Sequence, residues 1–163
     1  TVGTNPGRVL FISVPELLVR LRAAHPVFRR TEPFHFSDYR NFGFPDLSYH
    51  GIDAWKPDFS GYSHSIGILY CENYGSGDSA GKASARQPEL LYLAVNMYWQ
   101  EQTFGLPRLK GQRWRRILDS ALENPFEAEG EPEIADGRLT VGARTIVLLR
   151  SDRSEETPST AGV

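Results

Sequence analysis

The sequence predicts a mainly β fold: an antiparallel β-sandwich of about seven strands with one N-terminal helix. After residue 62, short apolar and aromatic segments recur at intervals of roughly 10–20 residues, and no segment with a helical period separates them. The chain of 163 residues also contains 15 glycines, 11 prolines and 12% aromatic residues, which favours short strands joined by turns. This length suits one domain with its own hydrophobic core.

The one predicted helix lies near the N-terminus, over Val14–Ala24. Its large apolar residues stand at positions i, i+3, i+4 and i+7, which places them on one face: Val14, Leu17, Leu18 and Leu21. Pro26 ends the helix, because the residue before a proline is pushed out of the α region. Residues 1–30 are therefore expected to form a lead-in followed by this helix.

Residues 31–62 form a second segment, a long loop with nine aromatic side chains and several prolines and glycines. We expect one short strand within it, over residues 47–51. A loop of this length with so many rings is expected to lie on a surface and to link two packed bodies.

Residues 63–151 contain the remaining strands of the predicted sandwich. We expect these strands over residues 65–72, 90–99, 103–106, 114–119, 138–141 and 145–149. The strand over residues 90–99 is the most apolar and is expected to be central in its sheet. Residues 74–88 are rich in Gly, Ser and Ala and are expected to form a mobile loop that folding does not require, and residues 152–163 a disordered tail.

Charge and hydropathy argue against nucleic-acid and membrane partners. The net charge of −2 supplies no general basic surface for nucleic acid or for an acidic membrane. The basic residues around Trp114 are better explained as the exposed face of a half-buried strand. No apolar run approaches the ~20 residues of a membrane span and no signal peptide opens the chain, so we expect a cytoplasmic protein.

The sequence predicts no metal site, no cofactor and no catalytic residue. No two of its four histidines have the i, i+4 spacing of a metal-binding helix, and the single cysteine, Cys71, excludes a multi-cysteine zinc site. Ser76 and Ala83 break the pattern of a phosphate-binding loop. A catalytic pair of carboxyl groups, such as retaining glycoside hydrolysis uses, must stand about 5 Å apart, and the sequence shows no strand motif that would hold such a pair. The acidic residues between positions 123 and 136 are instead typical of a solvated loop.

Five segments, taken in order, resemble the C-terminal end of isoamylase-type glycogen and starch debranching enzymes, which belong to the α-amylase superfamily of glycoside hydrolases. They are residues 25–30 (HPVFRR), 50–66, 93–107, 113–119 and 141–149, and the resemblance spans about residues 9–150. Three positions depart from the family's pattern, which often has tryptophan, arginine and threonine there: Phe59, His64 and Ser120.

The resemblance implies a fragment of a larger enzyme that cleaves α-1,6-glucosidic branch points in glycogen or a similar α-glucan. Residues 1–30 would contain the last helix of its catalytic barrel, and residues 63–151 would be the β-domain that follows the barrel. The family's catalytic carboxylates lie on barrel strands before this helix. The chain is therefore expected to be inactive by itself and to stabilise the barrel, its expected partner.

Three aromatic residues are candidates for contact with α-glucan: Trp55, Tyr98 and Trp99. Sugars stack on exposed rings, so an independent carbohydrate-binding module is the alternative function. The same rings could instead fill the core or the contact with the barrel. Tyr98 and Trp99 are expected to be neighbours on one strand, one facing in and one facing out. Without the barrel, the apolar surface of the helix and the aromatic loop is expected either to cause self-association or to leave the first ~30 residues poorly anchored.

Overall fold

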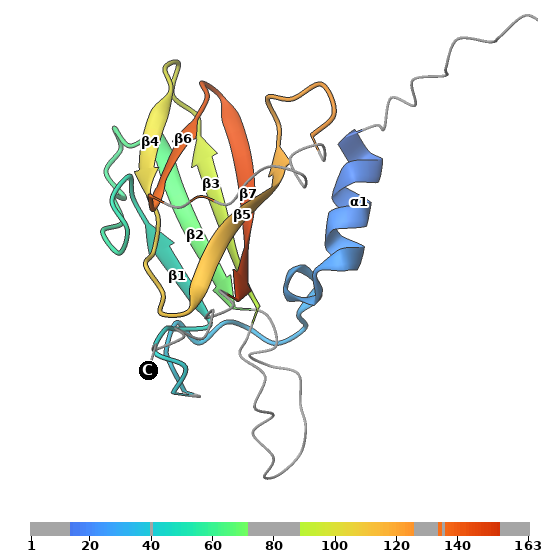
Figure 1. Cartoon of the computed structure of the whole chain (residues 1–163), viewed down its shortest axis with the longest axis vertical. Coiled ribbons are helices and arrows are strands. Elements are labelled where there is room, and N and C mark those ends of the chain that lie inside the picture. Colours follow the sequence, from blue (N-terminus) through green and yellow to red (C-terminus); the bar gives the residue numbers. More distant parts are fainter. Residues whose placement is uncertain (1–13, 40, 72–88, 126–133, 135, 154–163) are drawn as a thin grey trace, which may run out of the picture.

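The fold is described from a computed structural model that covers residues 14–39, 41–71, 89–125, 134 and 136–153 (Figure 1). An α-helix, α1 (Val14–Ala24), and a short 3-10 helix, η1 (Pro26–Arg29), precede the strands. Within these residues the strands are, in chain order, β1 (Leu47–His50), β2 (Ser65–Cys71), β3 (Leu90–Asn96), β4 (Gln102–Gly105), β5 (Gln112–Asp119), β6 (Arg138–Val141) and β7 (Thr145–Arg153). All strand pairs are antiparallel, which confirms the predicted mainly β fold.

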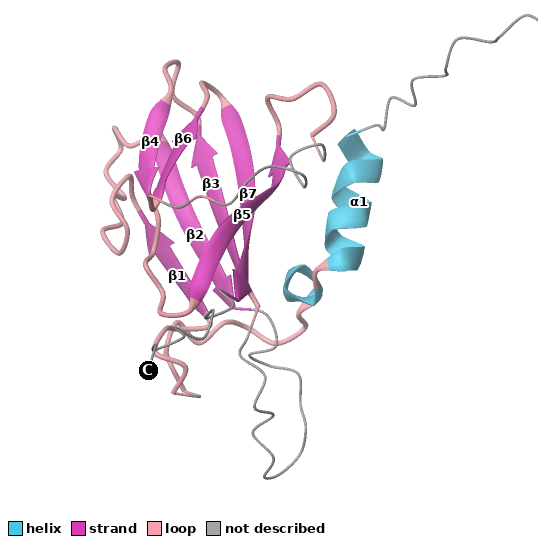
Figure 2. Cartoon of the chain, viewed as in Figure 1, coloured by secondary structure: helices cyan, strands magenta, loops and turns pink. Residues whose placement is uncertain are grey.

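The strands form two sheets that pack against each other (Figure 2). The larger sheet has the order β1-β2-β3-β7-β5, and the smaller sheet pairs β4 with β6. β3 is therefore the central strand of the larger sheet, as its apolar sequence predicts. Side chains from both sheets meet in the main core, and its largest fully buried members are Tyr92, Phe104, Leu69, Leu90, Leu139 and Leu149.

The outer face of the larger sheet is partly covered by the N-terminal segment. Val27 of η1 is buried there against Leu91 and Leu148, and Leu21 of α1 packs on the same cluster. A register shift in β5 between residues 116 and 118 brings Ile117 and Leu118 into this cluster as well. The end of the predicted barrel helix thus packs on the sheet of its own chain.

A buried carboxylate fixes the path of the chain between η1 and β1. Asp46 is fully buried, and its two carboxylate oxygens accept hydrogen bonds from the backbone N–H groups of His35 and Phe36, each at 2.9 Å. The guanidinium of Arg30 lies 3.4 Å from the same carboxylate. Because Asp46 directly precedes β1, these bonds hold residues 30–36 against the edge of the sheet.

Several boundaries differ from those expected. The strand expected over residues 47–51 is present as β1, which ends at His50 and forms an edge of the larger sheet. β3 ends at Asn96 rather than at residue 99. β7 continues to Arg153, so two residues of the predicted tail pair with β5, because Gln112 and Arg113 at the start of that strand provide partners. The predicted loop over residues 74–88 and the rest of the tail, residues 154–163, lie outside the described residues.

Around Trp114, the side chains of β5 alternate between the core and solvent. Trp114 points into the core and Arg115 points to solvent, as alternation along a half-buried strand requires. In the part of the chain that the structure describes, no helix is both long enough and apolar enough to span a bilayer.

Candidate functional site

The three candidate glucan-binding rings occupy two different turns. Tyr98 and Trp99 follow β3, and Trp55 follows β1. No ring contact joins Trp55 to the other two among the residues that the structure describes. The two turns are therefore separate candidate sites.

The turn after β3 is built by the side chain of Asn96. Its amide nitrogen donates to the carbonyl oxygens of Gln100, Val141 and Gly142, at 2.9, 3.2 and 2.8 Å. Its amide oxygen accepts the backbone N–H of Tyr98 at 3.0 Å. Asn96 is fully buried, so these bonds replace all the water that its amide loses on folding.

Three rings cluster on this turn, and we call them the end platform: His64, Tyr98 and Trp99. The rings of His64 and Tyr98 are nearly parallel, with centroids 5.8 Å apart and planes 11° apart. The Trp99 ring lies 5.5 Å from that of Tyr98, and 62% of its surface is exposed. His64 and Trp99 are therefore joined through the ring of Tyr98.

The expectation that Tyr98 and Trp99 are strand neighbours with opposite directions is wrong. Both residues lie beyond the end of β3, and both reach the surface, Tyr98 half-buried and Trp99 exposed. The reason is that the Asn96 side chain captures the backbone N–H of Tyr98, while Met97 donates its N–H to the His64 carbonyl oxygen at 2.8 Å. The Met97 bond extends the pairing of β2 with β3 by one residue, and the Asn96 bond then turns the chain out of the sheet at residue 98.

Trp55 closes a turn over a buried histidine. Its backbone N–H donates to Nδ1 of His50 at 2.8 Å, its ring lies 4.6 Å from the imidazole, and 45% of its surface is exposed. Its φ of +64° is a strained value for a large side chain. Nε2 of His50 lies 2.9 Å from the Ser48 hydroxyl. Because Nδ1 accepts a proton-donating N–H, the neutral ring carries its own proton on Nε2.

Burial lowers the pKa of His50 from 6.5 to about 4. An unfolded chain binds a proton at this residue near pH 6.5, whereas the folded chain does so only near pH 4. Between these values the unfolded state holds more protons, so folding stability falls as the pH falls.

We expect His50 to contribute a loss of stability on the order of 3 kcal/mol between pH 7 and pH 4. The measurement is urea unfolding of the wild type and of His50→Gln at both pH values. The glutamine does not titrate, so the pH dependence should be weaker in the variant. Equal pH dependence of the two proteins would contradict the assigned pKa shift.

A second group of exposed rings lies along the edge strand, and we call it the aromatic edge: Phe36, Tyr49 and Phe59. The centroid of Tyr49 on β1 lies 5.9 Å from Phe36 and 5.7 Å from Phe59. Phe36 has a strained φ of +55° and is held by the bond from its N–H to Asp46. The aromatic density of residues 31–62 predicted a surface of this kind but did not show which rings would meet.

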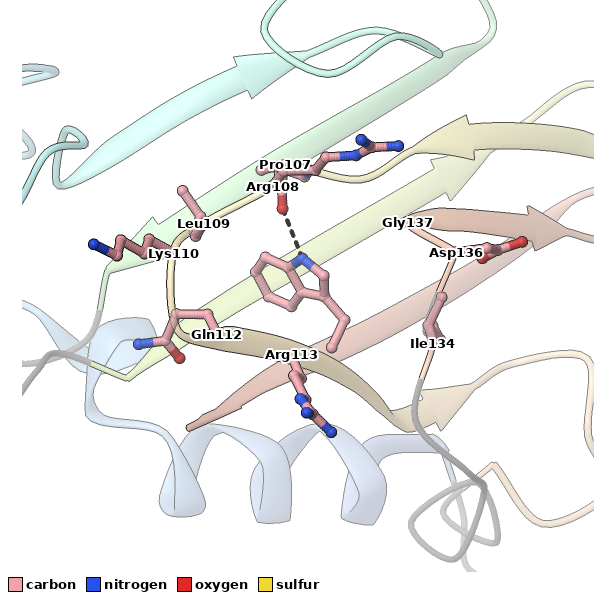
Figure 3. Close-up of a pocket in the computed structure, with 10 residues that line it drawn as sticks. Pro107, Arg108, Leu109, Lys110, Gln112, Arg113, Ile134, Asp136 and Gly137 are labelled. Carbon is pink, nitrogen blue, oxygen red and sulfur yellow. Dashed lines mark hydrogen bonds between the residues drawn. The ribbon is translucent and has the colours of Figure 1, made fainter. Parts of the chain in front are cut away.

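A cavity of about 780 Å³ lies between the β4–β5 connection, the start of β5 and the segment that leads to β6. Arg108, Lys110 and Arg113 line it, but their charged ends point away from one another (Figure 3). The indole N–H of Trp114 donates to the Pro107 carbonyl oxygen at 2.9 Å and is thus already bonded. The cavity therefore presents no convergent group of cations.

Two further cations of the basic cluster around Trp114 have acidic partners. Arg115 lies 2.9 Å from the carboxylate of Asp152, and Arg116 lies 2.9 Å from that of Asp119. The carboxylates neutralise the two arginines, whereas a nucleic-acid site needs unneutralised cations to bind phosphates.

Two carboxylates outside the aromatic surfaces, those of Asp58 and Asp119, have structural partners. Asp58 accepts the backbone N–H of Ser60 at 2.9 Å, and this bond lowers the pKa of Asp58. Asp119 ends β5 and accepts the N–H of Ala121 at 2.9 Å. Within the described ranges, no three His, Cys, Asp or Glu side chains are grouped so that they could hold a metal ion.

Comparison with known proteins assigns this chain to no family. No protein-family model matches this sequence, and no curated protein is significantly similar to it. The fold and the two aromatic surfaces define the class of this chain as a mainly β domain with two antiparallel sheets and exposed rings at one edge and one end.

Proposed function

We propose that this chain is the non-catalytic C-terminal β-domain of a glycogen-debranching glycoside hydrolase and that it stabilises the catalytic barrel before it in the parent enzyme. The resemblance of its segments to isoamylase-type enzymes supports this role. Polar residues within those segments build the fold: His50 and Asn96 are fully buried, and Asp119 caps a turn. Such residues suit a structural domain better than a reaction centre.

The distribution of exposed apolar side chains carries the proposal. Nine of the eleven large hydrophobic residues exposed in the described part of the chain fall within residues 18–62, and Met97 and Trp99 are the other two. They include Leu18 and Val19 on α1 and the whole aromatic edge. Surfaces of this kind mark contacts with another body. The preceding barrel is the body that the resemblance supplies, because residues 18–62 lead from the predicted last barrel helix into the β-domain.

The coding sequence upstream of Thr1 tests this function directly. It should encode a (β/α)₈ barrel with paired carboxylates at the ends of its strands, and the parent protein should release linear chains from pullulan or glycogen. An unrelated upstream domain, or a parent protein with no α-1,6-glucosidase activity, would overturn the proposal.

The isolated chain is expected to self-associate through the aromatic edge, because its rings lack their partner. The double variant Phe36→Ser/Phe59→Ser should move the sedimentation coefficient toward that of a monomer. Both residues are exposed, so the stability of the monomer should change by less than about 0.5 kcal/mol for each substitution. Trp99→Ser is the matched control, since it removes an equally exposed ring from another surface. A wild-type chain that stays monomeric at every concentration would contradict this prediction.

We also propose a cytoplasmic location. The single cysteine, Cys71, is a buried free thiol, which suits a reducing compartment.

A further inference from the structure

We propose that the end platform, formed by His64, Tyr98 and Trp99, is a carbohydrate-binding site that takes a neutral α-glucan chain on the exposed face of Trp99. The choice of α-glucan among carbohydrates rests on the proposed function. The location of the site does not, because the geometry of the turn after β3 defines it.

The first argument is that the turn is held rigidly. The backbone N–H of Tyr98 donates to Asn96, and its carbonyl oxygen accepts the N–H of Arg144 at 3.0 Å. On either side, the Met97 N–H and the Gln100 carbonyl oxygen are bonded as well, at 2.8 and 2.9 Å. Trp99 is therefore presented on a turn whose backbone is ordered before any ligand arrives, which lowers the entropy lost on binding.

The second argument is that this rigid turn exposes rings without burying them. Trp99 is 62% exposed and its neighbour Met97 is 53% exposed, although the main core lies under the same turn. The half-buried ring of Tyr98 lies nearly parallel to the ring of His64. Trp99 and Met97 thus form an apolar patch on an ordered turn, and such patches mark ligand-binding surfaces.

The size and charge of the platform select the ligand class. A stable protein interface needs roughly 800 Å² from each partner, whereas one aromatic side chain buries at most about 250 Å². The exposed ring of Trp99 with the half-buried ring of Tyr98 beside it is thus too small a surface for a protein partner but large enough for one or two sugar units. Nucleic acid would require several cations, whereas among the described residues the platform and the turn beside it offer two basic side chains, His64 and Arg144.

Polar side chains next to Trp99 can serve the hydroxyl groups of a sugar. Gln100 and Glu101 follow Trp99 on the exposed side of the turn, and Arg144 is exposed beside Tyr98 with a strained φ of +53°. Amide, carboxylate and guanidinium groups together offer both acceptors and donors. Trp55 is not part of this platform, because its contacts are with His50.

The test measures binding of the full chain to maltoheptaose by calorimetry and its retardation in native gels that contain glycogen. We expect Trp99→Ala to weaken maltoheptaose binding at least tenfold and to abolish retardation. His64→Ala, which removes the ring parallel to Tyr98, should give a smaller loss. Tyr62→Ala is the matched control, because Tyr62 is 91% exposed but lies outside the platform, and it should bind like the wild type.

Three results would overturn the proposal. They are no binding by the wild type at millimolar maltoheptaose, equal binding by Trp99→Ala, and a shift of Trp99→Ala toward monomer in sedimentation, which would make the platform a protein contact. Thermal melting of each variant shows that it is folded. None of these results decides the proposed function, which depends on the upstream barrel and the activity of the parent protein.

Discussion

Replacing Asn96 by aspartate is expected to lower the free energy of unfolding by about 4 kcal/mol, although the two side chains have nearly the same size. The amide nitrogen of Asn96 donates to three carbonyl oxygens, those of Gln100, Val141 and Gly142. In the variant, a carboxylate oxygen would face these three acceptors in a fully buried position. A buried charge next to unpaired acceptors costs more than a lost hydrogen bond.

Chemical denaturation at pH 7 measures this effect, and the matched control is Gln100→Glu. That control makes the same amide-to-carboxyl change on the same turn, but on an exposed side chain, so stability should change by less than about 0.5 kcal/mol. The Asn96→Asp variant should recover part of its loss as the pH falls, because its protonated carboxyl group can donate one hydrogen bond. A loss below about 1 kcal/mol at pH 7 would contradict the bonding that we assign to Asn96.

The substitution Gly67→Ala is expected to destabilise the chain by about 3 kcal/mol, because the new methyl group has no space. A Cβ at this position would overlap the hydroxyl oxygen of Tyr92, and it would lie 2.6 Å from Cζ of that ring and 3.2 Å from Cβ of His50. Tyr92 is fully buried in the main core and His50 is fully buried beside it, so neither side chain can move aside without disturbing the core.

Removal of the Tyr92 hydroxyl is expected to have an unusual effect on stability. This hydroxyl is buried, it has no hydrogen-bond partner among the described residues, and burial raises the pKa of Tyr92. Tyr92→Phe should therefore leave stability unchanged or raise it by about 1 kcal/mol. In the Tyr92→Phe background the cost of Gly67→Ala should fall by at least about 1 kcal/mol, because the overlapping oxygen is gone.

Urea unfolding of the two single variants and the double variant tests this coupling. Gly61→Ala is the control, because an added Cβ there meets nothing within 4 Å. Additive costs in the double variant would show that Tyr92 does not limit the space at Gly67.

These two positions connect the fold with the surfaces of the protein. Gly67 pairs with His50 across β1 and β2, so loss of the contact around Tyr92 would disturb the strand that carries Tyr49 of the aromatic edge. Asn96 holds the turn that carries Tyr98 and Trp99. We expect Asn96→Asp to weaken glucan binding even where the chain remains folded, because the turn would lose its order.

The sequence by itself determined the features that depend on neighbouring residues. The period of apolar residues and Pro26 predict a helix over Val14–Ala24, and α1 has those bounds. The apolar run that begins at Leu90 predicts a central strand, and β3 is central. The proline, glycine and aromatic content of the chain predicts a mainly β fold, and the two antiparallel sheets confirm it. In the first two cases the signal lies within a few residues of the element that it describes, and in the third it is the composition of the whole chain.

Only the tertiary structure decided where β3 ends and which rings meet. Asn96 bonds to Val141 and Gly142, 45 and 46 residues away, and this contact turns Tyr98 and Trp99 out of the strand that their apolar character predicts. Asp46 bonds to His35 and thereby directs the chain that carries Phe36 toward Tyr49. Asn96 and Asp46 are fully buried because their hydrogen bonds are completed, and the partners that complete them come together only when the chain folds.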